Sequence, residues 1–167
     1  MRLFFALWPP RATAEALYRW ASGLASESGG RVTVVDNIHL TLAFLGEADP
    51  VQAVLAAQRA KGQSHRLPID MARYVKRNEM VWVGPVVVPA ELASLANDLG
   101  SALRAGGFKL EERPFAVHVT LIRKARMPKS IPPLPRVEWP VDEFLLMRSR
   151  TSPRGSTYEA VERFSLS

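Results

Sequence analysis

The sequence contains no cysteine, which excludes disulfide bonds, thiolate metal ligands and a cysteine nucleophile. It has only three histidines, His39, His65 and His118, so a metal site would need carboxylates, and we expect neither a metal nor a cofactor. The longest apolar stretches, residues 3–10 and 80–90, fall far short of the roughly 20 residues of a membrane-spanning helix. The first residues also lack the apolar core and cleavage site of a secretory signal. These absences predict a cytoplasmic protein that does not contact a membrane.

The composition is that of a globular protein with an excess of positive charge. Its 167 residues suit one compact domain, and 47% of them are hydrophobic, enough to bury a core. Lysine and arginine number 22 against 16 aspartates and glutamates, which gives a net charge of +6. Such a charge attracts polyanions, so nucleic acids or nucleotides are the favoured partners. We expect the chain, residues 1–167, to form a single domain and a monomer.

The order of the predicted elements occurs twice. The first copy is a strand ended by two prolines, an amphipathic helix, a glycine pair and a second strand, over 2–8, 11–25, 29–30 and 37–46. The second copy has the same four features, over 80–83, from Ala90, at 106–107 and over 115–122. Two repeats, about 2–46 and 80–124, therefore indicate halves related by duplication.

Each copy ends in the pattern His-x-Thr-Leu. Residues two apart in a strand project from one face about 6.6 Å apart, so His39 lies beside Thr41 and His118 beside Thr120. Histidine titrates near neutral pH, so one copy can be protonated while the other is neutral. In-line displacement at phosphorus needs such a pair, because a base must deprotonate the nucleophile while an acid protonates the leaving oxygen. The threonine hydroxyls would donate hydrogen bonds to phosphoryl oxygens.

A structural role for these histidines is the competing interpretation. A single histidine in a strand is more often a half-buried structural residue than a catalyst. Two of the three histidines stand at matching positions of a repeat, on strands otherwise rich in leucine and valine, and packing does not explain that. His65 has no such partner and is predicted to be a solvated loop residue.

Several longer segments match a known family: Arg2–Leu7, Asn37–Glu47, Arg113–Phe115 and His118–Arg123. They closely resemble the bacterial RNA 2',3'-cyclic phosphodiesterases, also called 2'-5' RNA ligases, of the two-histidine phosphoesterase superfamily. The resemblance covers nearly the whole chain, including a predicted closing hairpin over 141–166.

The resemblance implies a bilobed α+β fold, in which two pseudo-symmetric antiparallel sheets with helices packed outside enclose a central cleft. It also implies metal-independent hydrolysis of a 2',3'-cyclic phosphate, on RNA ends or cyclic nucleotides, to the 2'-phosphate. His39 would be the proton donor to the leaving 3' oxygen and His118 the proton acceptor that activates water, with Thr41 and Thr120 holding the phosphate. The sequence by itself leaves the two histidine roles interchangeable.

The family pattern His-x-Thr-x-x-Arg brings Arg123 to the phosphate, whereas strict strand alternation puts Lys124 on the His118 face. Either the strand bends after Leu121 or Lys124 reaches instead, and the bidentate guanidinium favours Arg123. Phe5 and Tyr158 are the aromatic candidates for substrate binding. As a group, Phe4, Phe5, Trp8 and Trp82 are nevertheless predicted to pack mainly into the core, with the alternative that one of them stacks on the terminal base.

Three alternatives stay open on the residues alone. The same site could run the reverse of transesterification and join RNA ends in a 2'-5' linkage. A non-catalytic RNA-binding or nucleotide-binding module could keep the cleft, although such a protein would be expected to lose one of the four motif residues. A metallohydrolase is the weakest alternative, because the chain lacks a dense cluster of ligands such as His-Glu-x-x-His.

Overall fold

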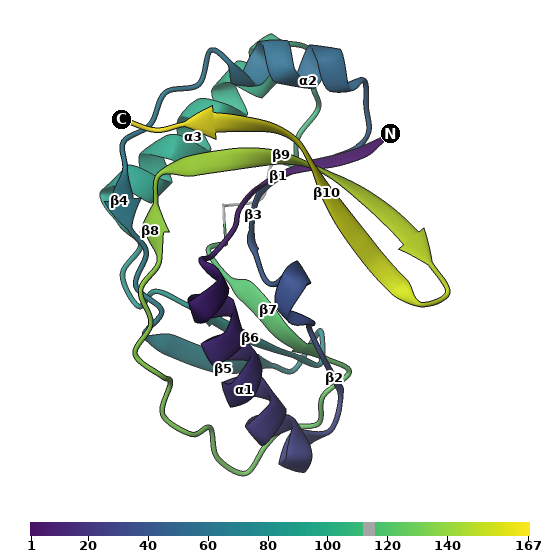
Figure 1. Ribbon diagram of the computed structural model, residues 1–167, viewed down its shortest axis with the longest axis vertical. Coiled ribbons are helices and arrows are strands. Elements are labelled where there is room, and N and C mark those ends of the chain that lie inside the picture. The colour runs from purple at the N-terminus through teal and green to yellow at the C-terminus, as the bar shows by residue number, and fades with distance from the viewer. Residues whose placement is uncertain (112–115) are drawn as a thin grey trace.

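The computed structural model describes residues 1–111 and 116–167, and its two main sheets each have four antiparallel strands (Figure 1). The first sheet has the order β10 (Gly155–Ser165), β9 (Glu143–Ser152), β1 (Arg2–Leu7) and β3 (Leu40–Glu47). The second sheet has the order β2 (Arg31–Val32), β7 (Val119–Arg123), β6 (Met80–Gly84) and β5 (Met71–Val75). Short strands β4 (His65–Arg66) and β8 (Pro140–Val141) pair with each other. The predicted α+β fold is confirmed.

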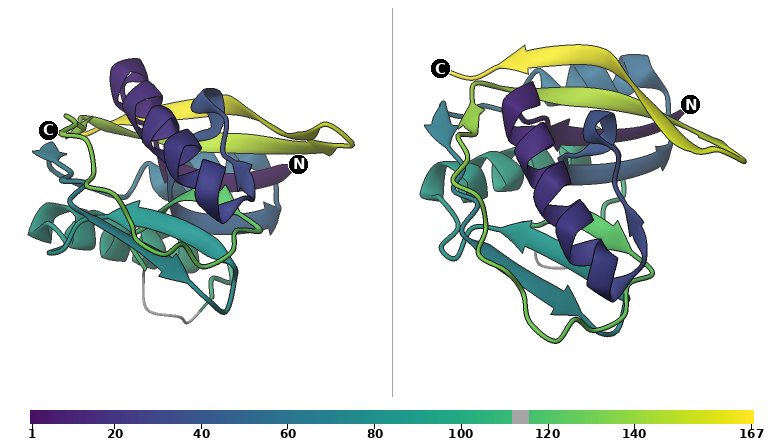
Figure 2. Two further views of the ribbon diagram at one scale, coloured as in Figure 1. Left: turned by 90° about the horizontal axis from the view of Figure 1, so that it is seen from below. Right: turned by 60° about the horizontal axis from the view of Figure 1, so that its bottom comes forward.

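Two of the helices cross from one main sheet to the other. Helix α1 (Arg11–Ser28) follows β1 of the first sheet but packs against β2 and β7 of the second. Helix α3 (Ala90–Ala105) follows β6 of the second sheet but packs against β3 of the first and against α2 (Pro50–Ala57). The right view of Figure 2 shows α1 lying across the second sheet. One continuous hydrophobic core therefore joins both sheets and all three helices.

Sequence periodicity explains each helix. Leu17, Ala21 and Leu24 form the buried side of α1, and Leu92, Leu95 and Leu99 form that of α3. Helix α2 starts with a proline after Asp49, whose side chain accepts a hydrogen bond from the backbone N–H of Val51. None of the helices in 1–111 and 116–167 is long and apolar enough to cross a lipid bilayer.

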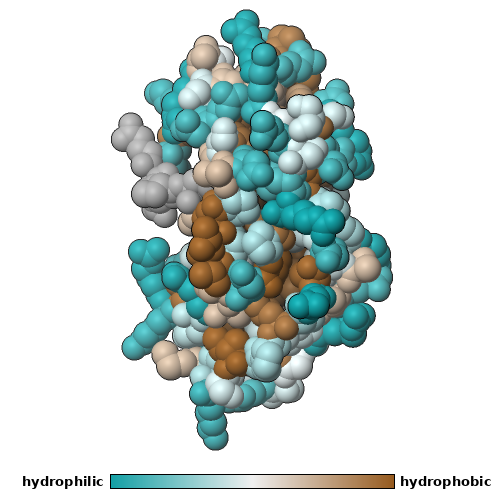
Figure 3. All heavy atoms as spheres, turned by 90° about the vertical axis from the view of Figure 1, so that its left-hand side faces the viewer, coloured by the Kyte–Doolittle hydropathy of each residue, from teal (hydrophilic) through white to brown (hydrophobic). Residues whose placement is uncertain are grey.

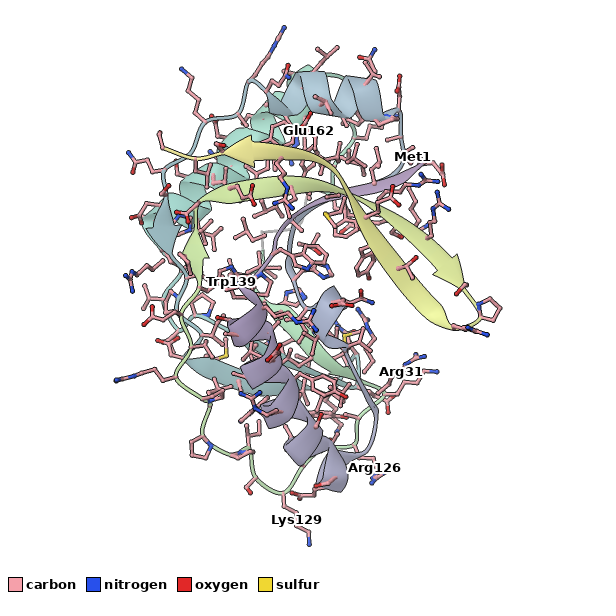
Figure 4. All side chains as sticks on the ribbon, viewed as in Figure 1. Met1, Arg31, Arg126, Lys129, Trp139 and Glu162 are labelled. Atoms are coloured by element: carbon pink, nitrogen blue, oxygen red, sulfur yellow. The ribbon has the colours of Figure 1, made fainter. Side chains whose placement is uncertain are left out.

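A proline-rich segment over 128–139 connects the second sheet to β8 along one side of the molecule. The indole of Trp20 donates a hydrogen bond of 3.0 Å to the carbonyl of Pro133, and the hydroxyl of Thr13 donates one to the carbonyl of Glu138. Trp139, at the end of the segment, is buried (Figure 4). A cavity of about 590 Å³ separates part of the segment from residues 68–72. Figure 3 shows this side of the molecule, where apolar patches alternate with polar side chains.

Several boundaries differ from those predicted. Both strands that carry the His-x-Thr pattern start one residue after the histidine, at Leu40 and Val119, because each imidazole is tied to the turn before the strand. Phe115 and the segment Arg113–Phe115 lie outside the described residues. His65 was predicted to be a solvated loop residue, which is wrong, since it is half-buried in β4 and its Nε2 has no contact with solvent.

The glycine pair after α1 brings β2 against β7. Gly29 and Gly30 have φ of 66° and 94°, a conformation that glycine adopts without strain. A Cβ added at Gly30 would lie 2.6 Å from the carbonyl oxygen of Arg123. Only a residue without a side chain therefore allows Arg31 and Val32 to reach the edge of the second sheet.

We expect Gly30→Ala to lower the free energy of unfolding by roughly 2 kcal/mol, because it adds both backbone strain and a backbone clash. Gly23→Ala is the matched control, since its added Cβ would meet nothing within 4 Å in the middle of α1. That control should gain about 0.5–1 kcal/mol through helix propensity. Urea unfolding curves measure both, and equal stability of the two variants would contradict this account of the turn.

Candidate active site

His39 stands immediately before β3, with its ring held on three sides. Its Nδ1 lies 2.7 Å from the carbonyl oxygen of Asn37, and a carbonyl only accepts, so Nδ1 carries the hydrogen. Its Nε2 is then the lone-pair nitrogen of the neutral ring and lies 3.1 Å from the Thr41 hydroxyl. The indole of Trp8 stacks on the imidazole at a centroid distance of 4.7 Å and an angle of 7°. The ring is thereby fixed in orientation and tautomer.

His118 repeats this arrangement at the start of β7. Its Nδ1 lies 3.1 Å from the carbonyl oxygen of Ala116, so Nε2 is again the nitrogen free to exchange a proton. The indole of Trp82 stacks on this ring at 3.9 Å and 18°. The two halves of the chain thus each supply one imidazole with the same tautomer and the same aromatic support.

A bulge after each threonine decides which later residue joins the site. In the first sheet Thr41 pairs with Ala6 and Ala43 with Phe5, so Leu42 is the extra residue. In the second sheet Thr120 pairs with Trp82 and Ile122 with Val81, so Leu121 is the extra residue. An extra residue reverses the alternation of the strand beyond it.

The bulge at Leu121 puts Arg123 on the face of Thr120, the first of the two alternatives that the sequence left open. The charge of Arg123 acts on both histidines and lowers the pKa of each. Lys124 follows in a turn with φ of 54°, outside β7, so strand alternation no longer directs it to the His118 face. The geometry favours Arg123 over Lys124 as the cation of the site.

Aromatic side chains gather around His39 on the same face of the first sheet. The Tyr158 ring, from β10, meets the imidazole edge-on at 5.3 Å, and the Phe4 ring lies 5.2 Å from it. Phe5 points the other way, because neighbours in a strand face opposite sides, and it is fully buried against Phe144 and Phe164. The prediction that Phe5 contacts the substrate is therefore wrong for this structure.

Sequence reasoning missed the part played by two tryptophans. Trp8 and Trp82 were expected in the core, but each covers a histidine ring. The alternation of β6 carries a signal for Trp82, since Val81 and Val83 on either side are fully buried and the residue between them must face the other way. Trp8 shares the parity of Phe4, whose ring also lies against His39, but both faces of β1 are buried, so alternation gives no such signal for Trp8.

Burial is the main electrostatic influence on both histidines. It lowers the pKa of His39, with a further lowering by Arg123 and His118, while the hydrogen bond to Asn37 opposes the change. Burial also lowers the pKa of His118, helped by Arg123 and Arg73 and opposed by the bond to Ala116. The guanidinium of Arg73 lies 5.5 Å above the Trp82 ring. Burial and the neighbouring positive charges therefore favour the neutral form of both imidazoles.

A cavity of about 660 Å³ adjoins the site and shares Trp8 with it. Leu145 and Met147 of β9 line it on the same face of the first sheet. Within the residues that the structure describes, no group of three or more histidine, aspartate or glutamate side chains could hold a metal ion. The site consists of two imidazoles, two hydroxyls and an arginine, which suits proton transfer at an anionic centre.

Comparison with known proteins gives consistent results. A family model described as LigT like phosphoesterase matches the chain twice, over residues 7–82 and 83–158. The RNA 2',3'-cyclic phosphodiesterase of Escherichia coli (strain K12) is 38% identical over 171 residues, which cover 99% of this chain and 96% of that protein. The RNA 2',3'-cyclic phosphodiesterase of Thermus thermophilus is 34% identical over 188 residues, 99% of this chain and 90% of that protein.

Solved structures agree with these relatives. The structure of E. coli LigT complexed with 3'-AMP has a TM-score of 0.90 and 34% identity, and the match covers 99% of this chain and 97% of that one. The structure of TT0787 from Thermus thermophilus has a TM-score of 0.82 and 28% identity, with coverage of 99% and 98%.

We expect both histidines to titrate below the ordinary value of about 6.5 when followed by NMR of their ring protons. Arg123→Gln should raise both pKa values, because that cation acts on both rings. Arg73→Gln should raise the pKa of His118 and leave that of His39 unchanged. Equal shifts of both rings in Arg73→Gln would show that this arrangement of charges is wrong.

Proposed function

Because the chain belongs to the LigT-like phosphoesterase family, we propose that it hydrolyses the 2',3'-cyclic phosphate of RNA ends or nucleosides to the 2'-phosphate. The observation that carries the proposal is the matched pair of imidazoles, His39 and His118, each fixed with Nδ1 on a carbonyl and Nε2 available. Displacement at phosphorus requires one proton acceptor and one proton donor on opposite sides of the phosphate. Two equivalent histidines from two sheets meet that requirement.

The proposed reaction moves two protons. Nε2 of His118 takes a proton from water, whose oxygen forms a bond to phosphorus. The bond from phosphorus to the 3' oxygen breaks, and Nε2 of protonated His39 gives its proton to that oxygen. The product carries a 2'-phosphate and a 3'-hydroxyl, and exchange with solvent restores both histidines. No step uses a metal ion.

The assignment of acid and base follows the family resemblance, since the two imidazoles have matching surroundings. The pKa values of both imidazoles are lowered, so the acid would hold its proton more readily once the anionic phosphate lies beside it. A bound negative charge within a few ångströms favours the protonated form of the adjacent ring. Substrate binding thus favours the protonated form of His39, the proposed proton donor.

Hydrogen-bond donors around the phosphate stabilise the charge of the transition state. Thr41 and Thr120 would each donate to a non-bridging oxygen, and the guanidinium of Arg123 would contact the same group. The Thr41 hydroxyl lies beside Nε2 of His39, so it would turn to the phosphate on binding. These groups supply charge stabilisation without a metal.

The rings around His39 suit the base of the terminal nucleotide. Phe4, Trp8 and Tyr158 enclose one side of the imidazole, and a base can stack on the partly exposed Trp8 or Tyr158, whereas Phe4 is buried. The substrates proposed are RNA with a 2',3'-cyclic phosphate end and cyclic nucleotides, handled by a cytoplasmic monomer. Run in reverse with a 5'-hydroxyl as nucleophile, the same site would form a 2'-5' RNA linkage.

We expect His39→Ala and His118→Ala each to lower kcat by about 10²- to 10⁴-fold, the usual contribution of a general acid or base. The assay uses a short RNA with a 2',3'-cyclic phosphate end in excess EDTA, with the product isomer identified. His65→Gln is the matched control, because this histidine lies in β4 outside the site, and it should retain activity. Folded wild-type protein that binds the RNA without turnover would instead support the binding-module alternative.

The pH dependence of kcat/KM should be bell-shaped, because one histidine must be protonated and the other neutral. Burial, and then Arg123, lower both pKa values, so the optimum should lie on the acid side of about 6.5. In Arg123→Gln the optimum should move to higher pH while kcat/KM falls. Steady-state rates across the pH range test this. An unchanged pH optimum in Arg123→Gln would show that Arg123 does not influence the pKa values of the two histidines.

A further inference from the structure

A second arginine stands directly beside Arg123 at the edge of the second sheet. Arg31 of β2 is the antiparallel partner of Arg123, and both side chains are exposed. Directly paired residues of an antiparallel sheet project from the same face. The neighbour of Arg31, Val32, pairs with buried Ile122 on the opposite, helix-covered face. Arg31 therefore lies on the face that carries Thr120 and Arg123.

Two like charges placed opposite each other destabilise a sheet. None of the ion pairs between described residues involves Arg31, Arg123 or Arg73. Other arginines do have carboxylate partners, such as Arg66 with Glu138 and Arg163 with Glu143. A pair of unneutralised guanidiniums, held together by the tight turn at Gly29 and Gly30, is the arrangement expected of an anion-binding site.

The arginines of the projecting hairpin are less well placed. Arg148 pairs with Glu159 across β9 and β10, whereas Tyr158, which faces His39, pairs with Ser149. Alternation therefore directs Arg148 and Arg150 away from the face of Tyr158. Figure 4 shows Arg31 at the edge of the second sheet that lies on the same side as this hairpin.

We propose that Arg31 binds the phosphate that joins the terminal nucleotide to the one before it, so that the preferred substrate is an RNA strand rather than a mononucleotide. The inference rests on the proposed function, in which Arg123 contacts the reacting phosphate. Neighbouring strands lie about 4.8 Å apart, so Arg31 extends the cationic surface one strand further from the histidines. A chain of phosphates matches this row of cations, and a lone cyclic phosphate leaves Arg31 without a partner.

The experiment compares adenosine 2',3'-cyclic phosphate with the dinucleotide ApA that ends in a 2',3'-cyclic phosphate. We expect the wild type to prefer the dinucleotide in kcat/KM, and Arg31→Gln to reduce that preference by roughly tenfold, mainly through KM, because one charge-assisted contact is lost. The salt dependence of log kcat/KM for the dinucleotide should also become less steep by about 0.7.

Arg59→Gln is the matched control, since it removes the same charge from an exposed position after α2, and it should leave the preference unchanged. Arg31→Gln should be at least as stable as the wild type, because it removes the repulsion from Arg123, and thermal unfolding checks this. An unchanged preference in Arg31→Gln, or an equal loss on both substrates, would overturn the proposal. If the wild type turns over neither substrate, the proposed function fails, and binding titrations with the same two ligands and variants then decide the role of Arg31.

Discussion

The site depends above all on the pleat of two strands, β3 and β7. In each strand one set of side chains must be buried against a helix, and Leu40 and Val119 occupy those positions in the core. The alternate side chains face the other way, and they include the threonine that lies beside each histidine. Because the side-chain period of a strand is two, burial of the leucine and valine rows fixes the polar rows as well. The face that carries the histidines and threonines is a consequence of how the core packs.

Two backbone carbonyls determine which nitrogen of each histidine ring is available to exchange a proton. The carbonyls of Asn37 and Ala116 hold Nδ1 of the two rings and leave Nε2 as the exchanging atom. Asn37 has a second contact, because its side-chain amide donates a 3.0 Å hydrogen bond to the carbonyl of Ser156 in β10. The same residue thus orients His39 and ties the closing hairpin to the site. Burial then lowers the pKa values of both rings.

The sequence predicted the order of elements, the two His-x-Thr strands and the α+β class, because each depends on local periodicity. It could not decide between Arg123 and Lys124, since the bulge at Leu121 arises from pairing with β6, about 40 residues away in the sequence. Phe5 was assigned to the site because composition does not show which face of a strand a residue occupies. Only the pairing register of β1 with β9 and β3 shows that face.

Arg31 was missed for a different reason. A strand of two residues has no periodicity to detect, and β2 exists only because a glycine turn brings it to an existing edge. The tryptophans were assigned to the core by composition, although the buried valines on both sides of Trp82 already indicate its direction. Sequence patterns therefore did not reveal the pairing register of distant strands or the tight turn that places β2.

The exchange of helices between the sheets bears on how the chain can fold. Helix α1 covers β2 and also β7, which appears only after residue 118, and α3 covers β3, which is completed before residue 48. Each main sheet combines two strands from before β6 with two strands from β6 onward, so a fragment cut between β5 and β6 would hold no complete sheet and would expose apolar surface until the other fragment docked on it. The two halves must therefore become ordered in one cooperative step late in folding, after most of the chain is available. Two complementary fragments, each unfolded alone, would regain structure only when mixed.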